Sequence, residues 1–185
     1  DFANTNLRLD NRTSADWSSK QQKLLLAARS AQSIGLSSSS VIARDLSSDA
    51  FNTQGILVVD LNGDGFSDVV TANDGHAVIV YYYNPTIPIE QTPGAVLINY
   101  PGHKRWGRDI AAGDIDNDGD IDLAIAQYDN PNILYLNNGT DNPFSGVTPL
   151  LITNDVHGSE SIVMEDMNGD GNLDIIVGNE PYASA

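Results

Sequence analysis

One short acidic pattern occurs three times in the chain at nearly equal intervals, and it limits the possible folds more than any other feature. Residues 60–68 read DLNGDGFSD, residues 114–122 read DIDNDGDID, and residues 166–174 read DMNGDGNLD. Each copy fits D-x-[DN]-x-D-G-x-x-D and is followed by an apolar run. Their first aspartates are 54 and 52 residues apart. A period near 50 residues predicts a repeat architecture. We call these segments loops 1, 2 and 3 and number their positions from the first aspartate.

Short runs typical of β-strands surround each loop, with turn residues between them. The expected strands are residues 56–59, 68–72, 77–83 and 95–100, then 110–112, 122–126, 132–136 and 150–153, then 162–164 and 173–177. Four short strands in a repeat of about 50 residues predict an all-β fold of propeller-type blades, each with four antiparallel strands. A parallel solenoid has shorter coils. An immunoglobulin-like sandwich would not place an acidic loop at the same point of every unit.

Two regions of different composition follow one another along the chain. Residues 1–50 form an N-terminal extension, in which residues 15–34 are rich in helix formers and predict a helix that either packs or docks a partner. Residues 51–185 hold the repeats, at about 51–104, 105–158 and an incomplete 159–185. These are about two and a half repeats, whereas propellers have about four to eight blades. We therefore expect a fragment of a longer propeller, or one completed by strands from elsewhere.

The chain is acidic, and much of the acidity lies in the three loops. It has 25 acidic and 9 basic residues and a net charge of -16. Eleven of the acids are in the loops: Asp60, Asp64, Asp68, Asp114, Asp116, Asp118, Asp120, Asp122, Asp166, Asp170 and Asp174. Such a charge disfavours nucleic acid and anionic membranes as partners, and no apolar run is long enough to insert across a membrane. The absence of cysteine excludes disulfides and thiolate sites.

Negative side chains at the alternating positions 1, 3 and 5 repel one another unless a cation lies between them. Oxygen ligands from positions 1, 3, 5 and 9, with the backbone carbonyl of position 7, suit Ca²⁺ better than Mg²⁺, which requires a stricter octahedron, or Zn²⁺, which prefers His or Cys. Glycine at position 6 permits the sharp turn. The predicted ligands for up to three Ca²⁺ ions are Asp60, Asn62, Asp64, Phe66 and Asp68, then Asp114, Asp116, Asp118, Asp120 and Asp122, then Asp166, Asn168, Asp170, Asn172 and Asp174.

Two simpler explanations of the loops fit less well. Asp-Gly and Asn-Gly hairpin turns would account for one copy but not for three at matched spacing. An EF-hand needs flanking helices and a glutamate at position 12, where this chain has Thr71, Ile125 and Val177.

The repeats resemble the FG-GAP/VCBS family, the calcium-binding propeller repeats also found in integrin α-chains. The matching segments are VVDLNGDGFSDVV, AAGDIDNDGDIDLAI and MEDMNGDGNLDIIVGN, with ILYLNNG at residues 133–139. The resemblance covers about residues 51–180. It implies that each loop joins two strands of one blade and that a structural calcium ion braces them.

The sequence offers no catalytic residues. His76, His103 and His157 lie in loop-like stretches without a partner motif, so we expect no enzymatic activity. The segment PGHKRWGR, with Lys104, Arg105, Trp106 and Arg108, is a candidate partner-binding site or a connecting loop whose cations neutralise nearby acids.

The expected function is that of a calcium-binding scaffold, or a domain that binds protein or carbohydrate. The alternatives are a non-catalytic module of a larger secreted hydrolase or lectin, and an accessory subunit of a larger assembly. Calcium sites of this kind suit an extracellular or other calcium-rich compartment.

Overall fold

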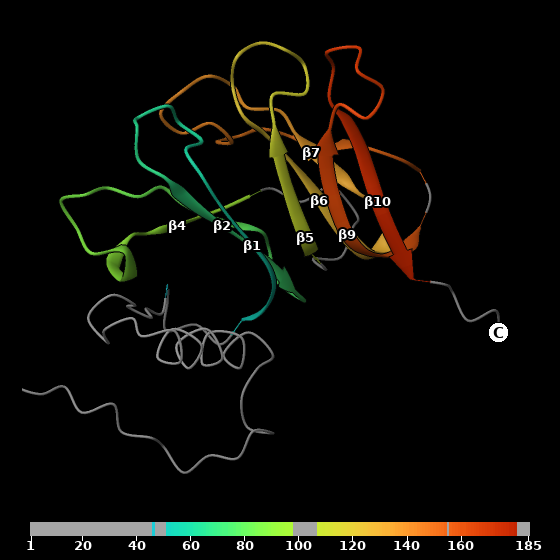
Figure 1. Cartoon of the computed structure of the whole chain (residues 1–185). Helices are drawn as coiled ribbons and strands as arrows, with labels where there is room; N and C mark the ends of the chain where they lie inside the picture. The colour runs from blue at the N-terminus through green and yellow to red at the C-terminus, as the bar shows by residue number, and fades with distance from the viewer. Residues whose placement is uncertain (1–45, 47–50, 98–106, 155, 181–185) are drawn as a thin grey trace, which may run out of the picture. The chain divides into compact units, whose positions relative to one another are not determined.

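The computed structural model describes residues 46, 51–97, 107–154 and 156–180, all within the compact unit Asp45–Ala185 (Figure 1). The helix expected at residues 15–34 lies outside the described residues, as do Lys104, Arg105 and Trp106. In the part of the chain that is described, no helix is both long and apolar enough to cross a membrane.

The first repeat forms one antiparallel sheet with the strands in chain order, as predicted for a blade. Its strands are β1 (Asn52–Val59), β2 (Asp68–Asp74), β3 (Ile79–Tyr81) and β4 (Gly94–Val96), with the short 3-10 helix η2 (Ile89–Gln91) before β4. The strand predicted at residues 77–83 is shorter than expected. Asn73 Nδ2 donates to the Ala77 carbonyl at 2.8 Å, which holds Ala77 in the preceding turn.

The second repeat forms four antiparallel strands in chain order, as predicted for a blade, and the third repeat pairs with the end of the second strand of that repeat. Their strands are β5 (Gly107–Gly113), β6 (Asp122–Asn130), β7 (Ile133–Tyr135), β8 (Leu150–Leu151), β9 (His157–Glu165) and β10 (Asp174–Glu180). The order is β10-β9-β6-β7-β8, and β5 also pairs with β6. β6 is long enough to extend past its pairing with β5, so Tyr128 pairs with Gly158 and Asn130 with His157. His157, expected in a loop, therefore begins β9.

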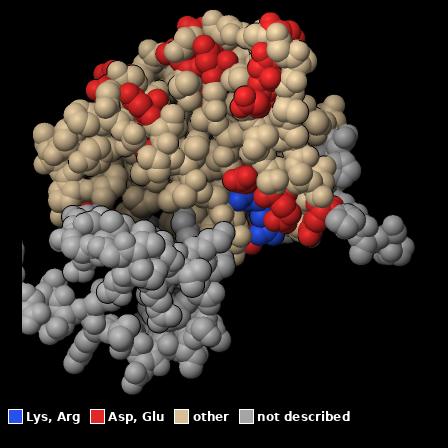
Figure 2. Space-filling model, in the orientation of Figure 1, with Lys and Arg blue, Asp and Glu red and all other residues tan. Residues whose placement is uncertain are grey.

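All three acidic loops lie at one edge of these sheets. Each loop joins the first two strands of its repeat, which pair up to the loop: Val59 with Asp68, Gly113 with Asp122, and Glu165 with Asp174. In Figure 1 the loops project from the upper edge. Figure 2 shows acidic atoms in separate groups along that edge, while the basic atoms visible in this view lie at the opposite end of the sheets.

Apolar side chains between consecutive repeats form the core. The larger cluster joins the first repeat to the second and includes Leu61, Val70, Val80, Ile110, Leu123, Ile125 and Tyr135. The smaller cluster joins the second repeat to the third through Ala111, Ala124, Ala126 and Ile162, with Met164, Ile175 and Val177 against it. Successive repeats are thus held together by burying one apolar face of each against the next.

The two outermost faces of this stack remain open to solvent. Ile176 is 37% exposed, although Val70, two residues after the loop in the first repeat, is fully buried. On the other side Ile56 is 48% exposed, although the matching Ile110 is 7% exposed. On each outer face an apolar side chain is thus exposed at a position that an adjacent repeat covers elsewhere in the stack. The described residues show no closed propeller.

The contact between β1 and β5 depends on a glycine. A Cβ on Gly55 would lie 2.9 Å from the Arg108 carbonyl oxygen and 2.9 Å from the Asp109 Cα, both backbone atoms that cannot turn aside. We predict that Gly55→Ala lowers the free energy of unfolding by about 1–3 kcal/mol, as overpacking in a core does. Urea unfolding measures the change, with the exposed neighbour Gln54→Ala as control. Equal stability of the two variants would contradict this account.

Candidate metal centres

The three loops share one backbone conformation. Position 6 is glycine with φ of 87° to 98°, and position 4 is also left-handed, with φ of 59° to 78°. Position 4 is Gly63, Asn117 and Gly169 in turn, residues that tolerate positive φ better than others do. The chain therefore curls in the same way in each loop, and the requirement at position 4 is an additional one that the sequence pattern had not revealed.

The position 1 carboxylate organises the centre of each loop. The backbone N–H of position 6 donates to it at 2.8 Å in loop 1, 3.0 Å in loop 2 and 2.8 Å in loop 3. In loop 3 the N–H of Gly171 is the main reason that the pKa of Asp166 is lowered. In loop 1 one oxygen of Asp60 takes this bond, while its Oδ1 is buried with no hydrogen-bond partner. A buried carboxylate oxygen without a donor is the condition that a bound cation would satisfy.

Positions 3 and 5 are held by short local hydrogen bonds. The N–H of position 7 donates to the position 5 carboxylate in every loop, at 2.8, 3.0 and 2.8 Å. Where position 3 is asparagine, in loops 1 and 3, its Oδ1 accepts the N–H of position 5 at 3.1 and 2.8 Å. These bonds fix the backbone of Phe66, Asp120 and Asn172, whose carbonyls were the predicted ligands.

The position 9 carboxylate closes the loop and joins it to the sheet. Asp68 is fully buried; its Oδ2 accepts the N–H of Leu61 at 3.0 Å and its Oδ1 that of Tyr83 at 2.9 Å. Asp122 repeats both bonds in loop 2, with Ile115 at 2.9 Å and Asn137 at 2.8 Å. In loop 3 Asp174 accepts the N–H of Met167 at 3.1 Å. Burial raises the pKa of both Asp68 and Asp122, the backbone donors opposing it.

Loop 2 brings the most carboxylates together. Asp114, Asp116 and Asp122 each offer an oxygen, and these three oxygens lie within 4.8 Å of one another. Asp118 is not in this cluster, and no second cluster of three acids or histidines occurs among the described residues. Loops 1 and 3 have asparagine where loop 2 has Asp116. The carboxylate at position 3 is therefore what distinguishes loop 2.

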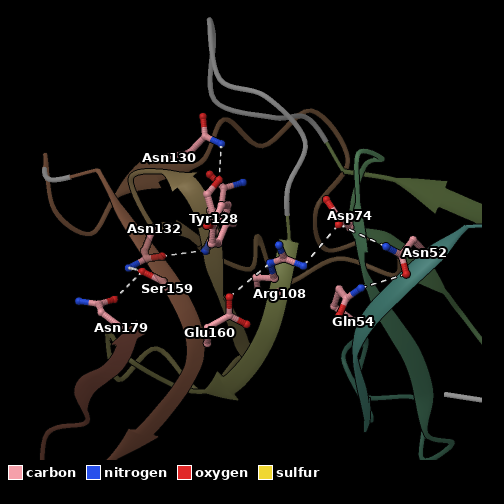
Figure 3. A network of polar contacts seen from close by, with 11 residues as sticks. Asn52, Gln54, Asp74, Arg108, Tyr128, Asn130, Asn132, Ser159, Glu160 and Asn179 are labelled. Atoms are coloured by element: carbon pink, nitrogen blue, oxygen red, sulfur yellow. Dashed lines mark hydrogen bonds and ion pairs between the residues drawn. The ribbon is translucent and has the colours of Figure 1, made fainter. Parts of the chain in front are cut away.

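No side chain among the described residues neutralises the loop acids. Arg108 is the only lysine or arginine in that part of the chain, and it forms ion pairs with Asp74 and Glu160. It lies in β5, and its Nη1 is 3.4 Å from Asp74 and its Nε 3.7 Å from Glu160. Its guanidinium also lies 4.7 Å from the ring centroid of Tyr128 (Figure 3). Arg108 thus bridges three repeats at the end opposite the loops, which agrees with the charge-neutralising alternative for this residue.

Besides the left-handed conformation at position 4, two further features of the site were missed at the level of sequence. One is the N–H of position 2, which donates to position 9 in every loop. The other is Asn137, whose side chain reaches from the second repeat to the Leu61 carbonyl in loop 1 at 2.9 Å. The quoted motif ILYLNNG contains Asn137, but only the tertiary contact shows what its amide does.

Comparison with known families agrees with this geometry. The sequence profile of the FG-GAP-like repeat matches residues 60–125 and again residues 114–177, together well over half of the chain. The chain belongs to the FG-GAP-like repeat family. Each match runs from one acidic loop through the next, so the two matches together span all three loops. No curated protein gives a significant match.

The number of carboxylates in each FG-GAP loop should rank their affinities for calcium. We predict that Asp116→Asn weakens loop 2 and that Asn62→Asp strengthens loop 1, each by up to about tenfold, because one charge near a protein surface contributes on the order of 1 kcal/mol or more. Calorimetric titration with Ca²⁺ measures both, with the exposed Asn154→Asp as a control for net charge. If Asn62→Asp gains no more affinity than Asn154→Asp, and Asp116→Asn loses none relative to the natural chain, the charge count does not set the ranking.

Proposed function

We propose that this FG-GAP-repeat chain is a calcium-binding, non-catalytic scaffold or interaction domain of propeller type. The observation that carries the proposal is the group of oxygens within 4.8 Å in loop 2, in a part of the chain where no cation of the protein itself approaches the loops. The buried, unpartnered Oδ1 of Asp60 gives loop 1 the same need. All the donors are oxygen atoms, which calcium prefers.

The proposed ion would be held by the side chains at positions 1, 3, 5 and 9 and by the position 7 carbonyl. It would supply positive charge between groups that otherwise repel one another. Backbone N–H groups hold the position 1 carboxylate in place before an ion binds: Gly65 donates to Asp60, and Asp118 and Gly119 donate to the two oxygens of Asp114. The loop is thereby shaped before binding, and less ordering is required of the bound state.

The interaction part of the proposal rests on the two open faces. Ile176 on one side and Ile56 and Val58 on the other are exposed, at 37%, 48% and 60%. We propose that further blades or a protein partner cover these faces, either within a larger propeller or as subunits of an assembly. The alternative of a non-catalytic module in a larger secreted hydrolase or lectin makes the same use of them. We propose carbohydrate as a second class of partner. The proposed location is an extracellular or other calcium-rich compartment.

We propose no catalytic role for the histidines. His76 packs on Phe51, with ring centroids 4.6 Å apart, which is a packing contact rather than an acid–base pair. The carboxylates at positions 1, 5 and 9 of each loop accept backbone N–H groups.

Calcium should stabilise the folded chain. Binding to the native state alone adds RT ln(1 + [L]/Kd), about 1.4 kcal/mol per site at ten times Kd, or roughly 4 kcal/mol for three independent sites. We predict a higher melting temperature in Ca²⁺ than in EGTA, measured by calorimetry, and a smaller difference in Asp114→Ala. Magnesium at the same concentration is the control for ionic strength. An identical melting temperature in calcium and EGTA would rule out the structural role.

The open face is tested by two substitutions at matched repeat positions. Val70→Thr should cost about 1–3 kcal/mol of unfolding free energy, because it buries a hydroxyl without a partner. Ile176→Thr should change it by less than about 0.5 kcal/mol, as exposed substitutions do. Urea unfolding of the full chain measures both. If Ile176→Thr lowers the free energy of unfolding as much as Val70→Thr does, this chain itself covers the face on which Ile176 lies.

A further inference from the structure

The side chain of Asn137 joins two acidic loops that belong to different repeats. Asn137 follows β7 and is only 6% exposed. Its Nδ2 donates to the Leu61 carbonyl of loop 1 at 2.9 Å and to the Ile121 carbonyl of loop 2 at 3.0 Å. Its Oδ1 accepts the N–H of Gly139 at 2.9 Å. Both amide hydrogens and the amide oxygen are therefore engaged, and burial shields these bonds from competing water.

The backbone of Asn137 is attached to a candidate ligand of loop 2. Its N–H donates to Asp122 Oδ1 at 2.8 Å, while Asp122 Oδ2 accepts the N–H of Ile115 at 2.9 Å. Asp122 cannot shift without disturbing Asn137. A change in loop 2 that reorients this carboxylate is thus transmitted to the Asn137 amide.

The other end of the connection is equally constrained. The N–H of Leu61 donates to Asp68 at 3.0 Å, its carbonyl accepts from Asn137, and its side chain is 3% exposed in the core. Leu61 lies between Asp60 and Asn62, which are candidate ligands at positions 1 and 3. Movement of Asn137 therefore either moves the backbone between these two ligands or leaves a buried carbonyl without a donor.

A purely local role for Asn137 does not explain this contact. The bonds to Gly139 and Ile121 would stabilise the turn after β7, but Leu61 is 76 residues away in sequence. The matching residue in the first repeat is Tyr83, whose N–H makes the same bond to Asp68 at 2.9 Å. A phenol cannot donate two hydrogens as an amide does, so the first repeat has no equivalent of this bridging side chain.

We infer that Asn137 is a positioning residue that couples loops 1 and 2, so that a cation bound in one loop raises the affinity of the other. The inference rests on the proposed calcium binding. Binding that orders Asp122 also orders Asn137 and hence Leu61, which removes part of the ordering cost of loop 1. Because coupling free energies are reciprocal, loop 1 acts on loop 2 by the same factor.

The link between loops 2 and 3 provides an internal comparison. Asn117 Nδ2 donates to Asn172 Oδ1 at 3.1 Å, and both residues are exposed. Water competes for such a bond, so it should transmit much less than the buried bridge. Loop 3 therefore reports what removal of loop 2 does to a neighbour that Asn137 does not touch.

The test is a calcium titration of the full chain followed by NMR, since the position 6 amides of Gly65, Gly119 and Gly171 report the loops separately. Removing loop 2 as a site with Asp116→Ala and Asp118→Ala should raise the half-saturating calcium concentration of loop 1 by about fivefold or more, the lower end of typical coupling. Loop 3 should change little. In an Asn137→Ser background the same removal should leave loop 1 unaffected, because serine cannot reach both carbonyls.

The matched control is Asn138→Ser, which alters the adjacent exposed side chain, bonded only to Thr140 within its own turn. It should retain the coupling. If loop 1 still binds calcium and its half-saturating calcium concentration does not change when the loop 2 site is removed, the coupling is overturned but the proposed function is not. If calcium changes none of the NMR signals of the three glycine amides, both the proposed function and the coupling are overturned.

A second measurement decides the case if Asn137→Ser does not fold. Hydrogen exchange at the Leu61 amide, in the otherwise natural chain with calcium, should become several-fold faster when loop 2 carries Asp116→Ala and Asp118→Ala. Exchange at the Met167 amide, at the same position of loop 3, is the control. Equal exchange at Leu61 with and without the loop 2 site would overturn the inference.

Discussion

A buried aspartate at the end of the acidic loop is the constraint on which the rest of this structure depends. Asp68 and Asp122 each accept one backbone N–H from the start of their loop and another from the residues after the third strand of their repeat. One side chain therefore ties the loop to two strands. Burial of a carboxylate is unfavourable, and here it raises the pKa of both groups. The fold accepts this cost where backbone donors, and in our proposal a cation, compensate the charge.

The stacking of repeats follows from the same arrangement. Each loop is closed at the same point of its hairpin. The two strands of each hairpin therefore extend from the loop in the same way, and they present an apolar face to the next repeat. Leu61, at position 2 of loop 1, is both a donor to Asp68 and a member of the core between the first two repeats. The polar and apolar parts of the fold are thus linked through single residues. At the opposite end Arg108 holds three repeats together by charge rather than by apolar burial.

Much of this could be anticipated from the sequence. Each of the ten strands expected in the repeats overlaps a strand of the structure, although residues 98–100 of the expected strand 95–100 lie outside the described residues. Alternating β-formers and Asp-Gly turns are local signals, which is why they could be read from the sequence. The loop pattern led to the FG-GAP-like family, since acidic spacing around a glycine is readable without coordinates. The limits of β3 were not predicted, because the turn bond from Asn73 to Ala77 competes with the ladder. The pairing of β6 with β9 was not predicted either, because the length of a strand does not determine which other strand it pairs with.

By itself, the sequence determined the repeat, the β-structure and the residues that surround each candidate metal centre, since spacing and residue type act over a few neighbouring positions. Only the tertiary structure decided which carboxylates of loop 2 converge, and that Asp60 has a buried oxygen without a donor. It alone placed Arg108 between three repeats and carried the Asn137 amide to a loop 76 residues away. These are contacts between segments distant in the chain. Their partners are chosen by how whole sheets pack, which no local pattern encodes.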